Sequence, residues 1–302
     1  MDRNKNLPGG RHRFKRDWIW AYAFIAPVIL GLVVLNIIPF LQSVWLSLHD
    51  KYSGALGLDN YIRMFTGDAL FWRSNLNTLL FTVLTVPVGI LLSLLLAVLL
   101  NRNIKCRNLY RGIFFLPLVC APAAIAMVWK WVVFNSKTGF LNYMLSFFGI
   151  TGPNWLSDPK IVMISIAIVA IWGSIGYDMV LLLAGLQGIS RTYYEAALID
   201  GAGSFQQFRY ITLPLLSPTL FFVIIMRTMN AIRQFDLSFM FVRDTDPAFP
   251  STQTLLYLFY RETYIKLNAN YGSAIVLWTM VLILLLTALQ FRGEKKWVHY
   301  DN

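Results

Sequence analysis

Residues 194–214 read YEAALIDGAGSFQQFRYITLP, and this stretch decides the interpretation of the chain. Its first part predicts a short helix that Ser190 or Thr192 can cap, with Glu195 near the positively polarised helix start. Gly201 is expected to end this helix, because glycine adopts a positive φ at no steric cost.

A second short helix is predicted from about Ser204 to Tyr210, after the glycine. Pro214 then fits the first turn of a following helix, where its missing N–H is not needed. An amphipathic segment lying on a membrane surface would be the alternative, but such segments are rich in Lys and Arg. Only Arg209 is basic between Tyr194 and Pro214, so the stretch predicts a helix–turn–helix offered to another protein.

The rest of the chain has the composition of a membrane protein. It is 57% hydrophobic and only 14% charged, whereas soluble domains carry about 25% charged residues. A membrane-spanning helix needs about 20 mostly apolar residues. Six stretches qualify: Trp18–Leu41, Asn77–Leu100, Gly112–Phe134, Ile161–Leu186, Pro214–Asp236 and Tyr271–Phe291. The first exceeds the apolar length of a signal peptide, so we expect an uncleaved anchor.

The distribution of Lys and Arg predicts the orientation. With the N-terminus in the cytoplasm, the inner segments hold 15 basic residues and the outer segments 7. Basic residues favour the cytoplasmic side, so both termini are expected to be cytoplasmic. This divides the chain into a basic N-terminus (1–17), a six-helix membrane domain (18–291) with a cytoplasmic loop at 187–213, and a cytoplasmic tail (292–302).

The net charge of +11 follows this topology and does not indicate nucleic-acid binding. Nucleic-acid binders carry a basic face on a soluble module, and the basic residues here gather in short segments between apolar runs. The two cysteines, Cys106 and Cys120, support neither a disulfide framework nor a metal site.

The stretch at 194–214 resembles the EAA motif of binding-protein-dependent ABC importer permeases. The matching residues, in fixed register, are Glu195, Ala196, Ala197, Asp200, Gly201, Ala202, Phe208, Ile211, Leu213 and Pro214. Segments such as Gly57–Tyr61, Gly139–Asn142 and Tyr271–Ala274 are similar to the carbohydrate branch, and within it to the first permease partner of maltose and glycerol-3-phosphate systems. The loop Val242–Pro250 lacks the Gly-Gly-Pro of many relatives, so relatives' substrates are not carried over.

This resemblance implies an all-α polytopic membrane protein, with six transmembrane helices in a type I ABC importer (MetI-like) bundle. It also implies that residues 194–209 form a coupling helix that docks on a cytoplasmic ATPase. The expected coupling residues are Glu195, Ala196, Ala197, Asp200, Gly201, Ala202, Phe205 and Phe208.

Polar side chains inside the predicted spans point to a substrate pathway, because such groups are costly in lipid. The candidates are Trp172, Tyr177, Asp178, Arg227, Asn230, Arg233 and Gln234. Arg227, Asn230 and Gln234 share one helix face. Arg227 has two interpretations: it binds an anionic substrate through its guanidinium fork, or it forms an ion pair with Asp178 or with a partner permease. The ion pair is the preferred interpretation.

The chain has no Gly-x-x-x-x-Gly-Lys-Ser/Thr loop, so an energy source must lie elsewhere. The resemblance implies a second permease subunit, an ATPase dimer that binds ATP and Mg, an external solute-binding protein and a carbohydrate substrate, with no cofactor on this chain. A secondary transporter would favour internal repeats, which are not evident. An enzyme is disfavoured because His12, His49 and His299 all lie outside the spans.

Overall fold

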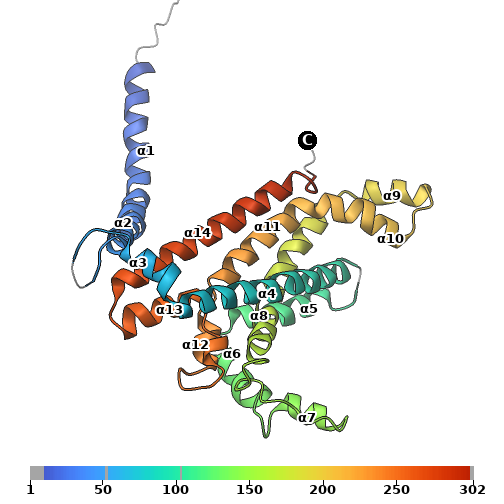
Figure 1. Cartoon of the computed structure of the whole chain (residues 1–302). Coiled ribbons are helices and arrows are strands. Elements are labelled where there is room, and N and C mark those ends of the chain that lie inside the picture. Colours follow the sequence, from blue (N-terminus) through green and yellow to red (C-terminus); the bar gives the residue numbers. More distant parts are fainter. Residues whose placement is uncertain (1–9, 52–53, 103, 300–302) are drawn as a thin grey trace, which may run out of the picture.

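The computed structural model describes residues 10–51, 54–102 and 104–299, and within these residues the fold is helical (Figure 1). Side chains are described from Trp18 onward, apart from Ile19. Of the predicted cytoplasmic ends, residues 1–9 and 300–302 lie outside the described part. The main helices are α1 (Gly10–Leu32), α2 (Ile38–Ser47), α4 (Ala69–Asn101), α5 (Arg107–Val119), α6 (Pro122–Val128), α8 (Val162–Gly188), α11 (Leu213–Ile232) and α14 (Ala269–Glu294).

Shorter helices connect the long ones. They are α3 (Asp59–Ile62), α7 (Phe140–Ser146), α9 (Arg191–Ile199), α10 (Ser204–Gln207), α12 (Asp236–Phe241) and α13 (Leu255–Tyr260). Wider helical turns occupy Val33–Ile37, Arg63–Gly67, Trp129–Val133, Phe208–Thr212 and Arg261–Ile265, and a 3₁₀ turn occupies Phe249–Ser251.

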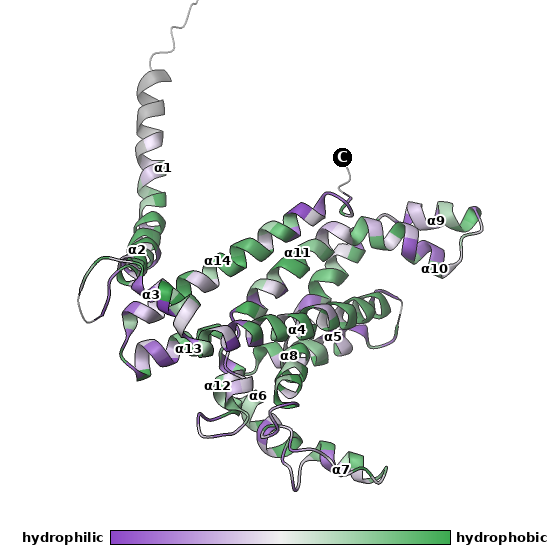
Figure 2. Cartoon of the chain, viewed as in Figure 1, coloured by the Kyte–Doolittle hydropathy of each residue, from purple (hydrophilic) through white to green (hydrophobic). Residues whose placement is uncertain are grey.

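Five continuous helices of the described part are long and apolar enough to cross a membrane: Trp20–Ser47, Ala69–Asn101, Val162–Gly188, Ser204–Ile232 and Ala269–Glu294. Their apolar residues dominate the colouring in Figure 2. All five overlap predicted spans. The start of α1 and the end of α14 are directed to the same side of the molecule (Figure 1).

The predicted span Gly112–Phe134 is not one helix. The structure breaks it between Val119 and Pro122, and the two halves meet at a bend of 101°. Pro122 has no N–H for the helix ladder, and its ring disfavours a helical conformation at the preceding residue. Ala121 accordingly takes an extended conformation, with φ −60° and ψ 131°.

The predicted fifth span also begins earlier than expected. Its helix starts at Ser204 rather than Pro214, so the second short helix does not end but continues into α11. The missing N–H of Pro214 is accommodated next to the wider turn Phe208–Thr212. One continuous rod therefore runs from the inner loop into the middle of the bundle.

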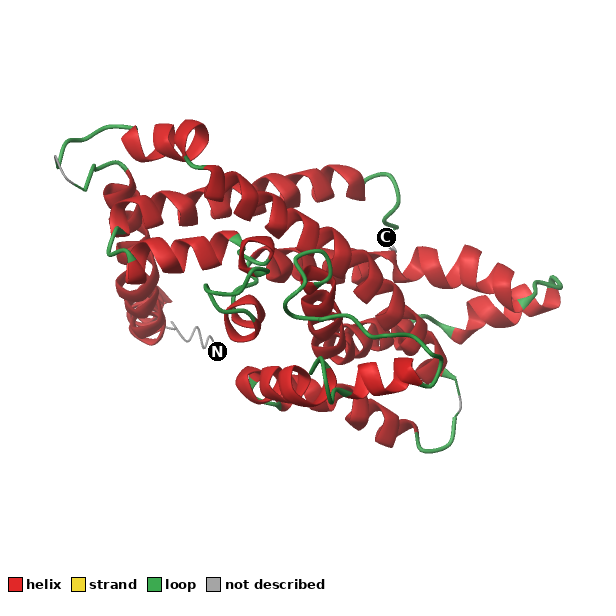
Figure 3. Ribbon diagram, turned by 60° about the horizontal axis from the view of Figure 1, so that its bottom comes forward, coloured by secondary structure: helices red, strands yellow, loops and turns green. Residues whose placement is uncertain are grey.

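Helices α4, α8 and α11 form the centre of the bundle, with Leu182, Leu216 and Val223 fully buried between them. Figure 3 shows the helical bundle and its connecting loops from a second direction. Small residues permit close approach, as is usual between membrane helices. A Cβ on Gly176 of α8 would lie 2.0 Å from the carbonyl oxygen of Phe114 on α5. These tight contacts fix the helices that carry the predicted pathway residues.

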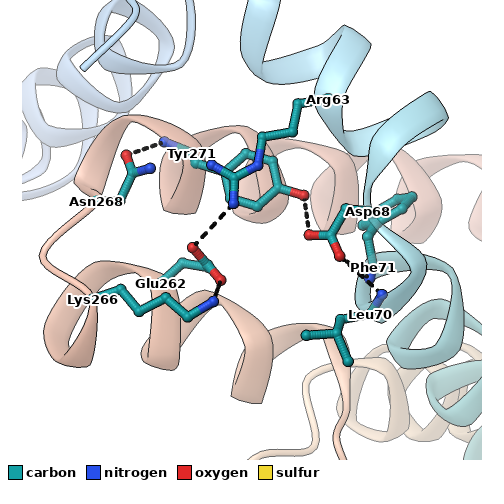
Figure 4. Close-up of polar contacts among 8 residues, drawn as sticks. All are labelled: Arg63, Asp68, Leu70, Phe71, Glu262, Lys266, Asn268 and Tyr271. Atoms are coloured by element: carbon teal, nitrogen blue, oxygen red, sulfur yellow. Dashed lines mark hydrogen bonds and ion pairs between the residues drawn. The ribbon is translucent and has the colours of Figure 1, made fainter. Parts of the chain in front are cut away.

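A polar cluster fastens the opposite end of the bundle from α9 (Figure 4). The Tyr271 hydroxyl donates to one carboxylate oxygen of Asp68 at 2.5 Å. The other oxygen of Asp68 caps the start of α4. The Arg63 guanidinium lies 4.1 Å from the centre of the Tyr271 ring. Glu262, only 1% exposed, pairs with Lys266 at 2.5 Å and Arg63 at 3.9 Å. The cluster ties α4, α14 and the Arg63 and Arg261 turns together.

Helix α1 stands away from the bundle (Figure 1), and none of its apolar window is buried within the chain. Only the following helix, α2, packs on α14, where the Asn270 amide donates to the carbonyl oxygens of Leu46 and His49 at 3.2 Å and 2.9 Å. The apolar surface of α1 is therefore available to lipid or to another subunit.

Candidate functional site: an exposed helical hairpin and a central cavity

Helices α9 and α10 form a hairpin that projects from one end of the bundle (Figure 1). The Ser190 hydroxyl caps α9 by accepting from the backbone N–H of Thr192 at 3.4 Å, as the sequence predicted. Gly201 follows α9 with φ +79°, which confirms the predicted glycine break.

The turn of the hairpin is closed by its own backbone. The N–H of Ala202 donates to the carbonyl of Ala197 at 2.8 Å, and that of Gly201 to the carbonyl of Leu198 at 3.1 Å. This pair of bonds is the Schellman arrangement that ends helices at a left-handed residue. The Gln206 side chain then accepts from the N–H of Gly203 at 2.8 Å, at the start of α10. The hairpin is thus a defined shape rather than a loose loop.

Large apolar side chains cover the tip of the hairpin. Ile199 is 87% exposed, Phe205 77% and Tyr210 75%. Contiguous exposed apolar surface on a folded protein usually marks an interaction site. Of the predicted docking residues, Glu195, Ala196, Asp200, Gly201 and Phe205 are exposed, while Ala197, Ala202 and Phe208 are half-buried.

The sequence prediction omitted Leu198, Ile199 and Tyr210 from this surface. Leu198 and Ile199 occupy the last turn of α9, directly before Asp200 and Gly201. Their position could have identified them, because they are apolar residues at the end of a short helix directly before a glycine turn. At the end of a projecting helix such side chains find no residues of the same chain to pack against.

The second feature is a cavity of about 320 Å³ in the middle of the bundle. Five predicted pathway residues line it: Tyr177, Asp178, Arg227, Asn230 and Gln234. Its walls also include the broken third span, through Pro117, Cys120 and Pro122. The cavity joins α4, α5, α6, α8, α11 and α12, so residues far apart in sequence meet there.

Two predicted pathway residues lie elsewhere. Trp172 packs edge-on against Trp129, with ring centres 5.5 Å apart, and Arg233 is exposed at the end of α11. Neither lines the cavity. Arg233 follows Ile232, the last residue of α11, so its direction is no longer set by the helical period.

A buried ion pair crosses the cavity wall. Arg227 of α11 donates through Nη1 to Asp178 of α8, and both side chains are less than a tenth exposed. The Nε–H of Arg227 also donates to the backbone carbonyl of Thr85 on α4 at 3.3 Å. The preferred interpretation of Arg227, an interhelical ion pair with Asp178, is therefore confirmed.

Gly89 makes room for this ion pair. A Cβ at this position on α4 would lie 2.0 Å from Nη2 of Arg227. Glycine is thus required there so that the guanidinium can lie flat against α4. The sequence gave no separate signal for Gly89, because the need arises only once α4 and α11 are side by side.

Two amide side chains of the cavity lining are uncommitted. Within the described residues, the amide of Asn230 and the amide nitrogen of Gln234 have no hydrogen-bond partner. A cavity that combines free amides with aromatic and aliphatic walls suits a polar, uncharged ligand. No group of His, Cys, Asp and Glu among the described residues is arranged to hold a metal ion.

Comparisons with known proteins agree with this arrangement. Residues 89–298 match the family model described as "Binding-protein-dependent transport system inner membrane component". The chain is 34% identical over 277 residues to the trehalose/maltose transport system permease protein MalF of Thermococcus litoralis, covering 90% of this chain and 92% of that protein. It is 31% identical over 302 residues to the sn-glycerol-3-phosphate transport system permease protein UgpA of Pectobacterium atrosepticum, covering 98% and 100%.

A solved structure shares the fold. It is a bacterial alginate ABC transporter in complex with an alginate pentasaccharide-bound periplasmic protein. One of its chains superposes with a TM-score of 0.83 at 23% identity, covering 94% of this chain and 96% of that chain.

Proposed function

This chain belongs to the binding-protein-dependent transport system inner membrane components and is a permease subunit of a sugar ABC importer; from that premise we propose separate roles for its central cavity and its α9–α10 hairpin. The central cavity passes the sugar, and the α9–α10 hairpin receives the motion of a separate ATPase. The observation that carries this proposal is the continuous helix Ser204–Ile232, which joins the hairpin to Arg227 and the cavity.

The hairpin fits the role of a docking element for an ATPase dimer. It is exposed, apolar at its tip and internally hydrogen-bonded, so it can enter a groove without changing shape. ATP and Mg would be bound by that dimer, because the chain carries no phosphate-binding loop. Small residues at Ala196, Ala197 and Ala202 would permit close contact with the groove.

Motion at the hairpin would reach the cavity through one rigid rod. From Ser204 to Arg227 the helix rises about 35 Å at 1.5 Å per residue. A displacement of the hairpin is therefore expected to move Arg227 relative to Asp178 and Thr85, which lie on other helices. ATP-driven closure of the dimer would in this way open and close the cavity.

Two further partners complete the proposal. A second permease would supply the other half of the pathway and cover apolar surface such as that of α1. A solute-binding protein would deliver sugar at the end opposite the hairpin, as the relative captured with its periplasmic protein suggests. The inner-membrane location follows from the family, and both termini are proposed to be cytoplasmic.

The cavity itself favours an uncharged sugar unit. Its one cation, Arg227, is neutralised by Asp178, and its free groups are amides. The relatives' names include both a neutral sugar and a phosphorylated solute, so an acidic substrate is the second candidate.

The docking role predicts a severe effect of charge at the hairpin tip. The double variant Ile199→Asp/Phe205→Asp places two charges on exposed apolar positions and should leave the fold intact. We expect it to lose stable association with the ATPase, and sugar-stimulated ATP hydrolysis to fall at least tenfold, because burying an unpaired charge costs several kcal/mol. Pull-down and ATP hydrolysis of the reconstituted complex measure both effects.

Tyr143→Asp is the matched control for this experiment, since Tyr143 is 60% exposed on α7 at the other end of the bundle. It should retain ATPase binding. Full stimulation in the hairpin variant would refute the docking role.

The proposed orientation can be tested with the two native thiols. Cys106 is exposed in the short segment between α4 and α5, at the hairpin end of the bundle. A membrane-impermeant maleimide should label Cys106 in inside-out vesicles and not in right-side-out ones. Measurements on a Cys120→Ser background isolate this thiol, and Cys106→Ser gives the blank. Labelling of Cys106 from the outside would reverse the topology.

A further inference from the structure

A second pocket lies at the end of the bundle opposite the hairpin. It has a volume of about 310 Å³ and is formed by the end of the broken third span, the segment before α8 and the segment after α12. Helix α8 begins at Val162, directly after the segment that lines this pocket, and ends at Gly188, directly before α9. The length of α8 therefore lies between the pocket and the hairpin. The pocket is thus separate from the α9–α10 hairpin.

The pocket continues the wall of the central cavity. On the third span, Ile125 lines the cavity and Lys130 lines the pocket, five residues further along. On α12, Leu237 lines the cavity and Phe241 the pocket, one turn further along. At 1.5 Å per residue these offsets are roughly 6–8 Å. The two spaces therefore lie next to each other along the same two helical segments.

Positive charge prevails in this outer pocket. Its charged lining residues are Lys130, Arg243 and Asp246, which leaves an excess of one positive charge. The Lys130 ammonium, half-buried, donates to the carbonyl oxygen of Phe241 at 2.9 Å. Asp246 accepts from the backbone N–H of Arg243 at 2.9 Å, so its carboxylate is partly occupied. Within the described part of the chain, neither cation forms an ion pair.

Three cations outside the pocket lining are already engaged. Arg63 and Lys266 both pair with Glu262 (Figure 4), and the Arg261 guanidinium lies 5.0 Å from the centre of the Phe249 ring. A half-buried ammonium held only by a carbonyl lacks the opposite charge that partly buried ions usually find. Among the residues that line the pocket, Lys130 and Arg243 are therefore the cations open to an incoming anion.

The pocket also has an aromatic wall suited to a sugar ring. Trp155 is stacked on Phe134, with ring centres 5.7 Å apart, and its indole N–H donates to the side-chain oxygen of Asn142 at 2.6 Å. Its orientation is thereby fixed. Asn135 and Asn154 add hydrogen-bonding groups to the lining.

We propose that this outer pocket is an entry subsite for an acidic saccharide, in which Lys130 and Arg243 bind an anionic group on one sugar unit while an uncharged unit enters the central cavity. The inference rests on the proposed function, because it assigns the substrate class of the same pathway. It places recognition of the charge at the entrance rather than at Arg227, whose own charge is already balanced.

The test uses the permease assembled with its partner permease in lipid nanodiscs. The acidic probe is labelled glucuronosyl-maltose, which has one anionic unit and two uncharged units, and labelled maltotriose is the neutral probe. Binding is followed by fluorescence anisotropy. The wild type should bind glucuronosyl-maltose at least tenfold more tightly than maltotriose. Lys130→Gln/Arg243→Gln should abolish this preference and leave maltotriose binding within twofold.

Lys137→Gln/Lys160→Gln is the matched control, because it removes the same charge from two exposed positions near the pocket. It should leave the preference unchanged. Arg243→Gln alone, at an exposed position, should weaken glucuronosyl-maltose binding at least threefold and guards against misfolding of the double variant. Equal binding of both probes by the wild type, or an equal loss in the control, would overturn the proposal. Sugar-stimulated ATP hydrolysis that persists in that case would show that the proposed function stands while this subsite fails.

Discussion

Replacing Arg227 with methionine is expected to destabilise the protein by about 3–5 kcal/mol, because it leaves the buried carboxylate of Asp178 without a counter-charge. Both side chains are less than a tenth exposed, so water cannot take over the role of the guanidinium. The bond from Arg227 to the Thr85 carbonyl is lost as well. The measurement is the free energy of unfolding in detergent micelles, together with the heat-denaturation midpoint.

A double variant distinguishes the effect of the unpaired charge from the effect of side-chain packing at position 227. Arg227→Met/Asp178→Leu removes both charges and should recover most of the lost stability, since a buried pair can often be replaced by apolar residues at little cost. Arg233→Met is the control, because it removes an exposed arginine directly after the end of α11. A double variant as unstable as Arg227→Met would show that the site depends on packing rather than on charge.

Gly201→Val should uncouple the transporter while leaving its assembly intact. Gly201 has φ +79°, and nothing lies within 4 Å of where its Cβ would be, so the penalty is one of backbone conformation alone. A left-handed conformation costs an ordinary residue about 1–2 kcal/mol, and a β-branched residue more. The Schellman turn should therefore reorganise, and sugar-stimulated ATP hydrolysis is expected to fall at least tenfold.

Gly203 provides the matched control two residues away. It has φ −72°, and a Cβ there would come no closer than 3.9 Å to the Gln206 side chain. Gly203→Ala should therefore keep near-normal stimulation. If both variants behave alike, the shape of the turn is not what transmits the motion.

The hairpin could be predicted from sequence because its determinants are local. Ser190, Gly201 and the apolar spacing each act within a few residues of themselves, and the structure confirms the first helix and its glycine end. The continuation of the second helix into α11 was missed, because Pro214 is a typical helix-start residue. A wider turn over Phe208–Thr212 accommodates it instead.

The cavity could be predicted only in part, because it depends on which helices meet. The sequence spacing predicted that Arg227, Asn230 and Gln234 share one helix face, and all three line the central cavity. Trp172 and Arg233 do not line this cavity, since a polar or aromatic residue type in a span does not reveal which way the side chain faces; their part in the pathway stays a prediction. Gly89 and the orientation of Lys130 follow from contacts between segments far apart in sequence.

The break in the third span also affects how specificity can be encoded. Helix ends leave backbone carbonyl and N–H groups without intrahelical partners, and the ends of α5 and α6 contribute Pro117, Cys120 and Pro122 to the cavity wall. Peptide groups are present whatever the side chains are. Alanine scanning would therefore miss any contact between a bound sugar and a backbone carbonyl at this edge, and related permeases could vary the side chains there as long as a proline keeps the break.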